Sequence, residues 1–354
     1  MTQLNRIGKK LQAGRRLDAD DALALFSTDD IHTLGELASE AARHINGNRA
    51  FWVRNLHVNP SNLCVNRCKF CAFSRSEGEE GAYELDTNDI IKRIRKAGPI
   101  SEVHVVGGLH PTWPFTHYVK MISRIRKAFP ALHIKAFTAT EMDYFSRISG
   151  LKIEDVLKKL KAAGLDSMPG GGAEIFSLDV RNALCPEKLS SEGWLDVMRT
   201  AHGLGIKSNA TMLYGHAESH SHRVEHLMRL RSLQDATGGF QAFIPLAYHP
   251  HNTELGGVAG SGLDDLRTIA VSRLVLDNFR HIKAYWVMLG PKLSQLALLW
   301  GADDLDGTIL DERITAAAGG TSGAGITADT LINLIKRAGR KPVERDSYYK
   351  AVKR

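Results

Sequence analysis

Three cysteines stand close together in the segment PSNLCVNRCKFCAF, residues 60–73. Cys64, Cys68 and Cys71 have the spacing C-x3-C-x2-C, and the 354-residue chain contains only one further cysteine. Thiolates are soft ligands that bind zinc ions and iron–sulfur clusters in proteins. The segment therefore predicts a metal centre that is held by one short loop.

The number of cysteines bears on which metal centre this is. A structural zinc ion takes four protein ligands, and neither His57 nor Cys185 has a ligand-like spacing from the other three. A four-iron cluster needs one thiolate per iron, so three cysteines leave one iron open to a substrate or cofactor. We predict a [4Fe–4S] cluster on Cys64, Cys68 and Cys71. The alternative of a different class is a zinc-stabilised binding barrel without catalytic activity.

The composition is that of an ordinary globular protein, with 43% hydrophobic and 24% charged residues. No apolar run reaches the roughly 18 residues of a membrane span, and the N-terminus lacks the apolar region of a secretory signal. The net charge is +7, but the basic residues are spread among 39 acidic ones and lie on helix-like patterns. We expect a cytoplasmic protein with reduced thiols that binds neither nucleic acid nor a membrane.

Strand-like segments alternate with amphipathic, helix-like segments along most of the chain. The predicted strands are residues 51–58, 102–106, 133–138, 165–167, 208–213, 240–247, 283–288 and, most weakly, 298–302. Such alternation implies a parallel sheet, and seven or eight repeats over roughly 250 residues predict a (β/α)8 barrel of the TIM type. An open doubly wound sheet is less favoured, because no G-x-G-x-x-G turn follows the first strand.

Three regions are predicted. A helical extension covers residues 1–48, the barrel covers 49–315, and a C-terminal extension that packs on the barrel covers 316–354. The three cysteines follow the first strand, and polar residues or glycines follow most of the others. In a (β/α)8 barrel these loops meet at the carboxyl ends of the strands, where active sites are built.

The cysteine segment resembles the radical S-adenosylmethionine (SAM) superfamily, because an aromatic residue, Phe70, precedes the last cysteine of the C-x3-C-x2-C motif. The resemblance implies a [4Fe–4S] cluster on the three cysteines and SAM bound at the open iron. It places Phe70 beside the adenine and Gly107-Gly108 at the methionine amine. Glycine allows such a close approach of the backbone to a ligand.

Further segments resemble one group in this superfamily, among them VVGGLHP, KAFTATE, GLDSMPGGGAEIF, FIPLAYHP and RAGRKPVERD. The group contains aminodeoxyfutalosine synthases, dehypoxanthine futalosine cyclases and the deazaflavin synthase components, and PGGGAEIF and FIPLAYHP are similar to the synthases. A synthase adds the 5′-deoxyadenosyl radical to the enolpyruvyl double bond of 3-[(1-carboxyvinyl)oxy]benzoate in menaquinone biosynthesis, and SAM is consumed. The cyclase and deazaflavin reactions, which begin with hydrogen abstraction, are alternatives.

The resemblance also implies two partners, an anionic aromatic small molecule and an electron donor such as flavodoxin or ferredoxin. The loops after the strands supply further candidates. We assign them to catalysis (His216, His249 and Glu174), to cofactor binding (Glu141) and to substrate binding (Arg181, Tyr248, Asn252 and Arg345). Imidazoles bind carboxylates or move protons, and a guanidinium fork matches a carboxylate.

Overall fold

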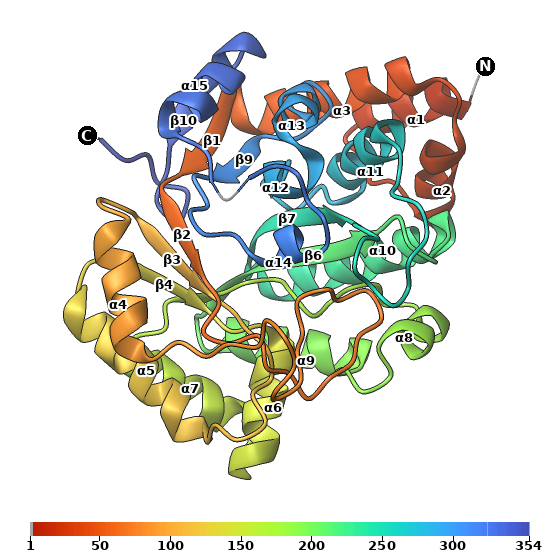
Figure 1. Cartoon of the computed structure of the whole chain (residues 1–354). Coiled ribbons are helices and arrows are strands. Elements are labelled where there is room, and N and C mark those ends of the chain that lie inside the picture. The colour runs from red at the N-terminus through yellow and green to blue at the C-terminus, as the bar shows by residue number, and fades with distance from the viewer. Residues whose placement is uncertain (1–2, 324, 354) are drawn as a thin grey trace.

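The computed structural model describes residues 3–323 and 325–353 (Figure 1). The chain opens with three helices, α1 (Gln3–Gln12), α2 (Ala19–Ser27) and α3 (Ile31–Asn46). Aspartate side chains start two of them, since Asp18 caps α2 and Asp30 caps α3 by accepting backbone N–H groups of the first turn. Helix α3 packs against α11 (Gly262–Val275), so the opening helices cover one side of the molecule.

Seven parallel strands form the main sheet in chain order. They are β2 (Asn55–Val58), β3 (Glu102–Val105), β4 (His133–Ala136), β5 (Ser167–Met168), β6 (Lys207–Tyr214), β7 (Phe240–Ala247) and β8 (His281–Ile282). The helices that connect them are α4 (Thr87–Lys96), α5 (Phe115–Ala128), α6 (Ala139–Ser149), α7 (Ile153–Ala163), α8 (Leu178–Leu184), α9 (Ser191–Gly203), α10 (His220–Thr237) and α11. Single parallel bridges, Lys283 with Asp304 and Leu56 with Leu310, link the two edges of this sheet through one further segment. The predicted α/β barrel with a parallel sheet is confirmed.

A second, three-stranded parallel sheet stands beside the barrel in the order β10 (Lys341–Glu344), β1 (Arg49–Val53), β9 (Asp304–Gly307). The remaining helices are α12 (Trp286–Leu289), α13 (Pro291–Ala297), α14 (Ile314–Ala317) and α15 (Ala328–Arg337). No described helix is both long and apolar enough to cross a bilayer.

The residues after β10 close the amino end of the barrel. Arg345 Nε donates to Asp304 Oδ2 at 2.7 Å, and Gln241 Nε2 donates to the carbonyl oxygen of Ser347 at 2.7 Å. The Tyr349 ring stacks on His281 with a centroid separation of 3.5 Å. Because Gln241, His281 and Asp304 lie at the beginnings of their strands, this segment covers the amino end of the barrel.

Three predicted strands differ from the structure. Residues 51–58 form two strands, β1 and β2, which belong to different sheets. The strand predicted at 283–288 is misplaced, because β8 covers only His281–Ile282 and the second half of the predicted segment begins helix α12. The strand predicted at 298–302 is wrong, because the apolar run ALLW ends helix α13 in a turn and the strand is β9. A short apolar run does not distinguish a strand from a buried helix end.

Candidate functional site

One cavity of about 330 Å³ opens among the loops at the carboxyl ends of the strands and continues into the barrel. We call its loop end the mouth, formed by residues 64–74, 107–109, 138–141, 169–174 and 248–249 together with Lys188. We call its inner end the floor, formed by six side chains of the strand region: His57, Glu102, His104, Lys135, Lys283 and Asp306.

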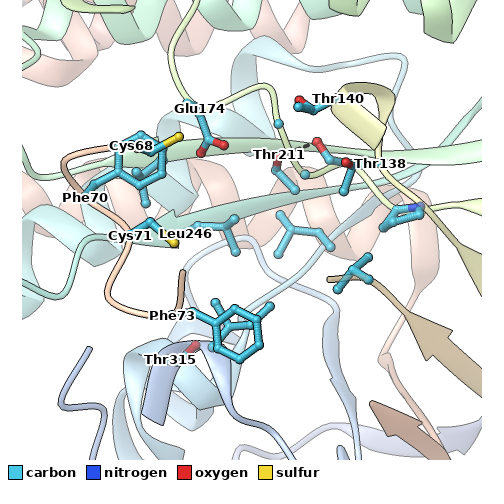
Figure 2. Close-up of a pocket in the computed structure, with 18 of the residues that line it drawn as sticks. Cys68, Phe70, Cys71, Phe73, Thr138, Thr140, Glu174, Thr211, Leu246 and Thr315 are labelled. Atoms are coloured by element: carbon cyan, nitrogen blue, oxygen red, sulfur yellow. Dashed lines mark hydrogen bonds between the residues drawn. The ribbon is translucent and has the colours of Figure 1, made fainter. Parts of the chain in front are cut away.

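The three cysteines of the C-x3-C-x2-C motif all line the mouth. Figure 2 shows Cys68 and Cys71 beside the Phe70 ring, with the Glu174 carboxylate on the same side of the cavity. Leu109 N–H donates to Cys64 Sγ at 3.4 Å, and burial raises the pKa of that thiol. Cys71 N–H donates to the carbonyl oxygen of Cys68 at 2.9 Å, which folds the loop tightly.

The glycine pair packs directly against the cysteine loop. A Cβ atom on Gly108 would lie 2.1 Å from the carbonyl oxygen of Leu63, and one on Gly107 would lie 2.9 Å from that of Ser61. Only glycine allows two backbone segments to approach so closely. The backbone at Gly107-Gly108 is therefore fixed beside the first cysteine of the motif.

Glu141 connects this glycine pair to helix α6. Its carboxylate accepts the N–H of Thr138 at 2.6 Å and the N–H of Gly107 at 3.3 Å, while the Thr138 hydroxyl accepts the N–H of Glu141. This reciprocal capping box starts the helix. Glu141 is buried at the edge of the cavity, and burial raises its pKa to about 7.

Glu174 forms an ion pair with a residue that the sequence analysis missed. Lys188 Nζ donates to Glu174 Oε1 at 2.5 Å and lies 5.2 Å from the centre of the Phe70 ring. Burial of Glu174 opposes its ionisation, but Lys188 holds the pKa of the carboxyl below its ordinary value. Glu174 has φ +48, a strained conformation for a residue other than glycine, of a kind that clusters at functional sites.

The floor consists of two buried ion pairs and one histidine pair. Lys135 Nζ donates to Glu102 Oε2 at 2.6 Å, and Lys283 Nζ donates to Asp306 Oδ2 at 2.9 Å. His104 Nδ1 and His57 Nε2 are 3.3 Å apart, and burial lowers the pKa of both imidazoles, which keeps them neutral.

The sequence analysis missed the whole floor, although a signal was present. Strands of a parallel barrel normally read as continuous apolar runs, and a charge in the middle of one marks a side chain that faces the interior. The tetrapeptide His-Ile-Lys-Ala stands at both 133–136 and 281–284. In each copy the isoleucine packs in the apolar core and the lysine lines the cavity.

Ten of the predicted site residues line the cavity, all at the mouth: Cys64, Cys68, Phe70, Cys71, Gly107, Gly108, Glu141, Glu174, Tyr248 and His249. Tyr248 donates its hydroxyl to the carbonyl oxygen of Gly256 at 3.0 Å, and His249 Nε2 donates to that of Met288 at 3.0 Å. These bonds fix the two side chains at one wall and leave His249 Nδ1 without a partner in this network.

The other four predicted residues do not line the cavity. Arg181 is buried and donates to backbone carbonyl oxygens, among them that of Ala173 at 2.5 Å. Arg345 is buried at the opposite end of the barrel in its ion pair with Asp304. The His216 side chain is enclosed against Glu218 and the carbonyl oxygen of Leu213. Asn252 is exposed and donates to the carbonyl oxygen of Ala317 at 3.0 Å.

The mouth fits a [4Fe–4S] cluster. It offers three thiols from one tight loop, a backbone N–H directed at one of the sulfur atoms, and no carboxylate within the segment 64–71. Soft thiolate ligands and hydrogen bonds to sulfur are typical of such clusters. Cys64, Cys68 and Cys71 would hold three irons, and the glycine pair and Glu141 line the same cavity as these cysteines.

Comparison with known proteins agrees with this reading of the site. Residues 58–230 match the radical SAM superfamily, and residues 237–354 match the CofH/MqnC C-terminal region. An aminodeoxyfutalosine synthase of Thermus thermophilus is 46% identical over 354 residues, which cover 98% of this chain and 95% of that protein. A 5-amino-6-(D-ribitylamino)uracil–L-tyrosine 4-hydroxyphenyl transferase of Methanopyrus kandleri is 40% identical over 346 residues, with coverages of 95% and 94%.

The fold is also that of a solved structure. The crystal structure of methylornithine synthase superposes with a TM-score of 0.76 at 19% sequence identity, covering 95% of this chain and 97% of that one. At this level of identity the likeness establishes the shared fold alone.

Proposed function

The chain belongs to the radical SAM superfamily, and we propose that it joins the 5′-deoxyadenosyl group of SAM to 3-[(1-carboxyvinyl)oxy]benzoate. As an enzyme of this superfamily it uses a [4Fe–4S] cluster and SAM. The radical would add to the enolpyruvyl double bond. Rearrangement and loss of the carboxyl as carbon dioxide or bicarbonate, with one electron returned to the cluster, would give 6-amino-6-deoxyfutalosine. Methionine is the second product, so SAM is a consumed substrate in this step of menaquinone biosynthesis.

The observation that carries this proposal is the 46% identity to an aminodeoxyfutalosine synthase over nearly the full length of both chains. The shape of the site supports it. The cavity places the cysteine loop at one end and cationic side chains at the other, which suits a substrate that presents an alkene to the cofactor and carries carboxylates.

The proposed roles of the mouth residues follow from their positions. When bound, the cluster supplies the electron that cleaves the carbon–sulfur bond of SAM. As the family resemblance implies, Phe70 would offer an aromatic face for the adenine, and the backbone of Gly107-Gly108 would bind the methionine end of the cofactor. Glu141 holds the N–H of Gly107 in place and lies within the same wall, so it both shapes and borders the cofactor site.

Glu174 and His249 are the catalytic candidates that remain after the structure is considered. Glu174 is held ionised by Lys188, so this pair presents a carboxylate and an ammonium group to the mouth. His249 keeps its ring in place through Met288, so its Nδ1 atom can accept a hydrogen bond from the substrate. An external electron donor such as flavodoxin or ferredoxin is part of the proposal.

A second candidate function has specific support. The 40% identity to the 4-hydroxyphenyl transferase is close to the 46% identity to the synthase, so identity over the whole chain favours the synthase by a small margin. That transferase acts on tyrosine and 5-amino-6-(D-ribitylamino)uracil, as its name states. The dehypoxanthine futalosine cyclase reaction is the third possibility within the group.

One anaerobic experiment decides among these reactions. The chain with a reconstituted cluster is incubated with SAM and a reductant, and with each candidate substrate in turn, and the products are identified by mass spectrometry. We expect an adenine-containing adduct with the enolpyruvyl benzoate, formed as SAM is consumed. Free 5′-deoxyadenosine without an adduct, or turnover only with tyrosine and the aminouracil, contradicts the proposal.

A further inference from the structure

We propose that the floor of the cavity is a carboxylate-binding subsite in which Lys135, Lys283 and His104 bind the ring carboxylate of the substrate. This inference rests on the proposed function for the identity of the ligand. The subsite itself is argued from the hydrogen-bond donors that the floor leaves without partners.

The two lysines have donors to spare. An ammonium group carries three N–H donors. Among the described residues, Lys135 donates to Glu102 alone and Lys283 donates to Asp306 alone. Both side chains are almost completely enclosed, with 3% and 2% of their residue surface exposed, so bulk water does not satisfy the remaining donors. Each lysine therefore has N–H groups that remain for a ligand in the cavity.

The two lysines reach the cavity from opposite walls. They occupy equivalent places in the two His-Ile-Lys-Ala segments, and β4 and β8 stand four positions apart in a barrel of about eight strands. Their charges are close enough to interact, since Lys283 is among the groups that lower the pKa of Lys135, after burial as the main cause. A carboxylate has two oxygens and can therefore accept hydrogen bonds from two such donors at once.

His104 supplies a third, independent indication. Its Nδ1 atom faces His57, whereas its Nε2 atom is buried and has no hydrogen-bond partner within the described part of the chain. A buried polar atom without a partner is costly, and native proteins rarely leave one unless a ligand or water meets it. If His57 donates to His104 Nδ1, the Nε2 atom of His104 carries the proton and can donate to a carboxylate.

The acidic partners explain why the floor remains stable without a ligand. Glu102 and Asp306 balance the two lysines, so the empty floor carries no net charge from these four groups. A ligand carboxylate does not have to displace either acid, because it uses N–H groups that the acids leave free. The floor is thus selective for an acceptor of hydrogen bonds and does not depend on an excess of positive charge.

The position of the floor selects which carboxylate it binds. The cofactor is held at the mouth by the cysteines, so the reacting double bond must face the mouth. The carboxylate on the enolpyruvyl group is attached directly to that double bond, whereas the ring carboxylate is at the meta position of the benzene ring, several bonds further away. The ring carboxylate is therefore the group that reaches the floor.

The test compares two ligands that differ only at that group. They are 3-[(1-carboxyvinyl)oxy]benzoate and the corresponding benzamide, and each is titrated calorimetrically into the cluster-loaded enzyme with SAM and without reductant. The charge preference is the ratio of the two dissociation constants. Because hydrogen bonds to a charged group are worth about tenfold or more each, we expect the parent enzyme to prefer the benzoate by roughly 100-fold.

Two variants test the subsite by different routes. His104→Phe keeps the ring that packs edge-on against His57 but removes the unpartnered nitrogen. Lys135→Met/Glu102→Leu removes one ion pair as a unit, so no charge is left buried alone. Each should lower the charge preference by about tenfold while leaving affinity for the benzamide nearly unchanged. Lys158→Met, at an exposed pair on α7, is the matched control and should bind like the parent.

The outcomes separate the subsite from the reaction. Variants are compared only when their iron content and melting temperature match the parent. A charge preference that persists in both variants overturns the subsite. If the parent discriminates between the ligands but forms no adduct, the proposed reaction fails and the carboxylate subsite stands. If the parent binds neither ligand, the proposed substrate fails and the inference about its ring carboxylate fails with it.

Discussion

The mouth and the floor of the cavity are built in different ways. The mouth consists of loops, and its geometry comes from close backbone approach and strained conformations, such as Gly108 against Leu63 and the positive φ of Glu174. The floor consists of strand side chains paired in ion pairs and a histidine contact. The mouth therefore depends on spacing within short segments, whereas the floor depends on which strands are neighbours in the barrel.

The largest expected effect is the loss of a cluster ligand at the mouth. In Cys71→Ala, one iron loses its only protein ligand, so we expect the chain to retain little iron after reconstitution and activity to fall by more than about 1000-fold, since the uncatalysed reaction is negligible. Iron analysis, the visible spectrum and the product assay measure this. Cys185→Ala is the comparison, because the Cys185 thiol is hydrogen-bonded to that of Cys68 but lies outside the C-x3-C-x2-C motif, so this variant should keep its iron. Equal iron loss in both variants would contradict the assignment of the cluster.

The floor should respond to mutation with a loss of stability. Lys135→Met leaves Glu102 buried without its partner, and we expect the free energy of unfolding in urea to fall by about 3–5 kcal/mol. Lys158→Met, which breaks an exposed pair with Glu154, should leave it unchanged within error. Lys135→Met/Glu102→Leu should recover most of the loss. Equal stabilities of the two single variants would show that the floor pair is not buried as described.

The same contrast explains what the sequence could predict. The cysteines, Phe70 and the glycine pair lie in two short segments whose chemistry is visible in residue types and spacing. The alternation of strand-like and helix-like segments was also enough to predict the parallel barrel, because hydrophobic periodicity can be read from each segment alone. The floor was not predicted as a site, because His57, Lys135 and Lys283 are single polar residues in separate strands. Only the closed barrel brings them together.

The misplaced candidates have a related cause. Arg181 and His216 follow strands, as residues of a mouth should, but their donors are taken up by backbone carbonyl oxygens and by Glu218. Arg345 lies in a tail that folds under the barrel, and nothing local indicates which end that tail reaches. Position after a strand predicts proximity to the mouth, but it does not predict whether a side chain is already hydrogen-bonded.

Glu141, at the mouth, should make the free energy of unfolding of the chain depend on pH. Its pKa in the folded chain is about 7, raised by burial from an ordinary value of 4.5. Between these values the unfolded chain loses this proton and the folded chain keeps it, so stability falls as pH rises from about 4.5 to 7. Glu141→Gln cannot ionise, so its stability relative to the parent should rise across this window by on the order of 3 kcal/mol.

Urea unfolding of the cluster-free chain at several pH values measures this change. Glu154→Gln is the control, because a hydrogen bond from Lys158 lowers the pKa of the Glu154 carboxyl and the sign of its pH effect is opposite. A parent and a Glu141→Gln variant with parallel pH profiles would show that this carboxyl is not desolvated at the mouth.

The smallest effect should come from adding one methyl group to the glycine pair. In Gly108→Ala the new Cβ atom would lie 2.1 Å from the oxygen and 2.7 Å from the carbon of the Leu63 carbonyl, and backbone atoms cannot rotate away as a side chain can. The strand end must move from the cysteine loop, at a cost of about 2 kcal/mol in the free energy of unfolding. Gly203→Ala at the end of α9 meets no atom within 4 Å and should not be destabilised. If Gly108→Ala melts and binds SAM like Gly203→Ala, the close approach at the mouth is not what positions the cofactor, and side chains of the mouth must do so.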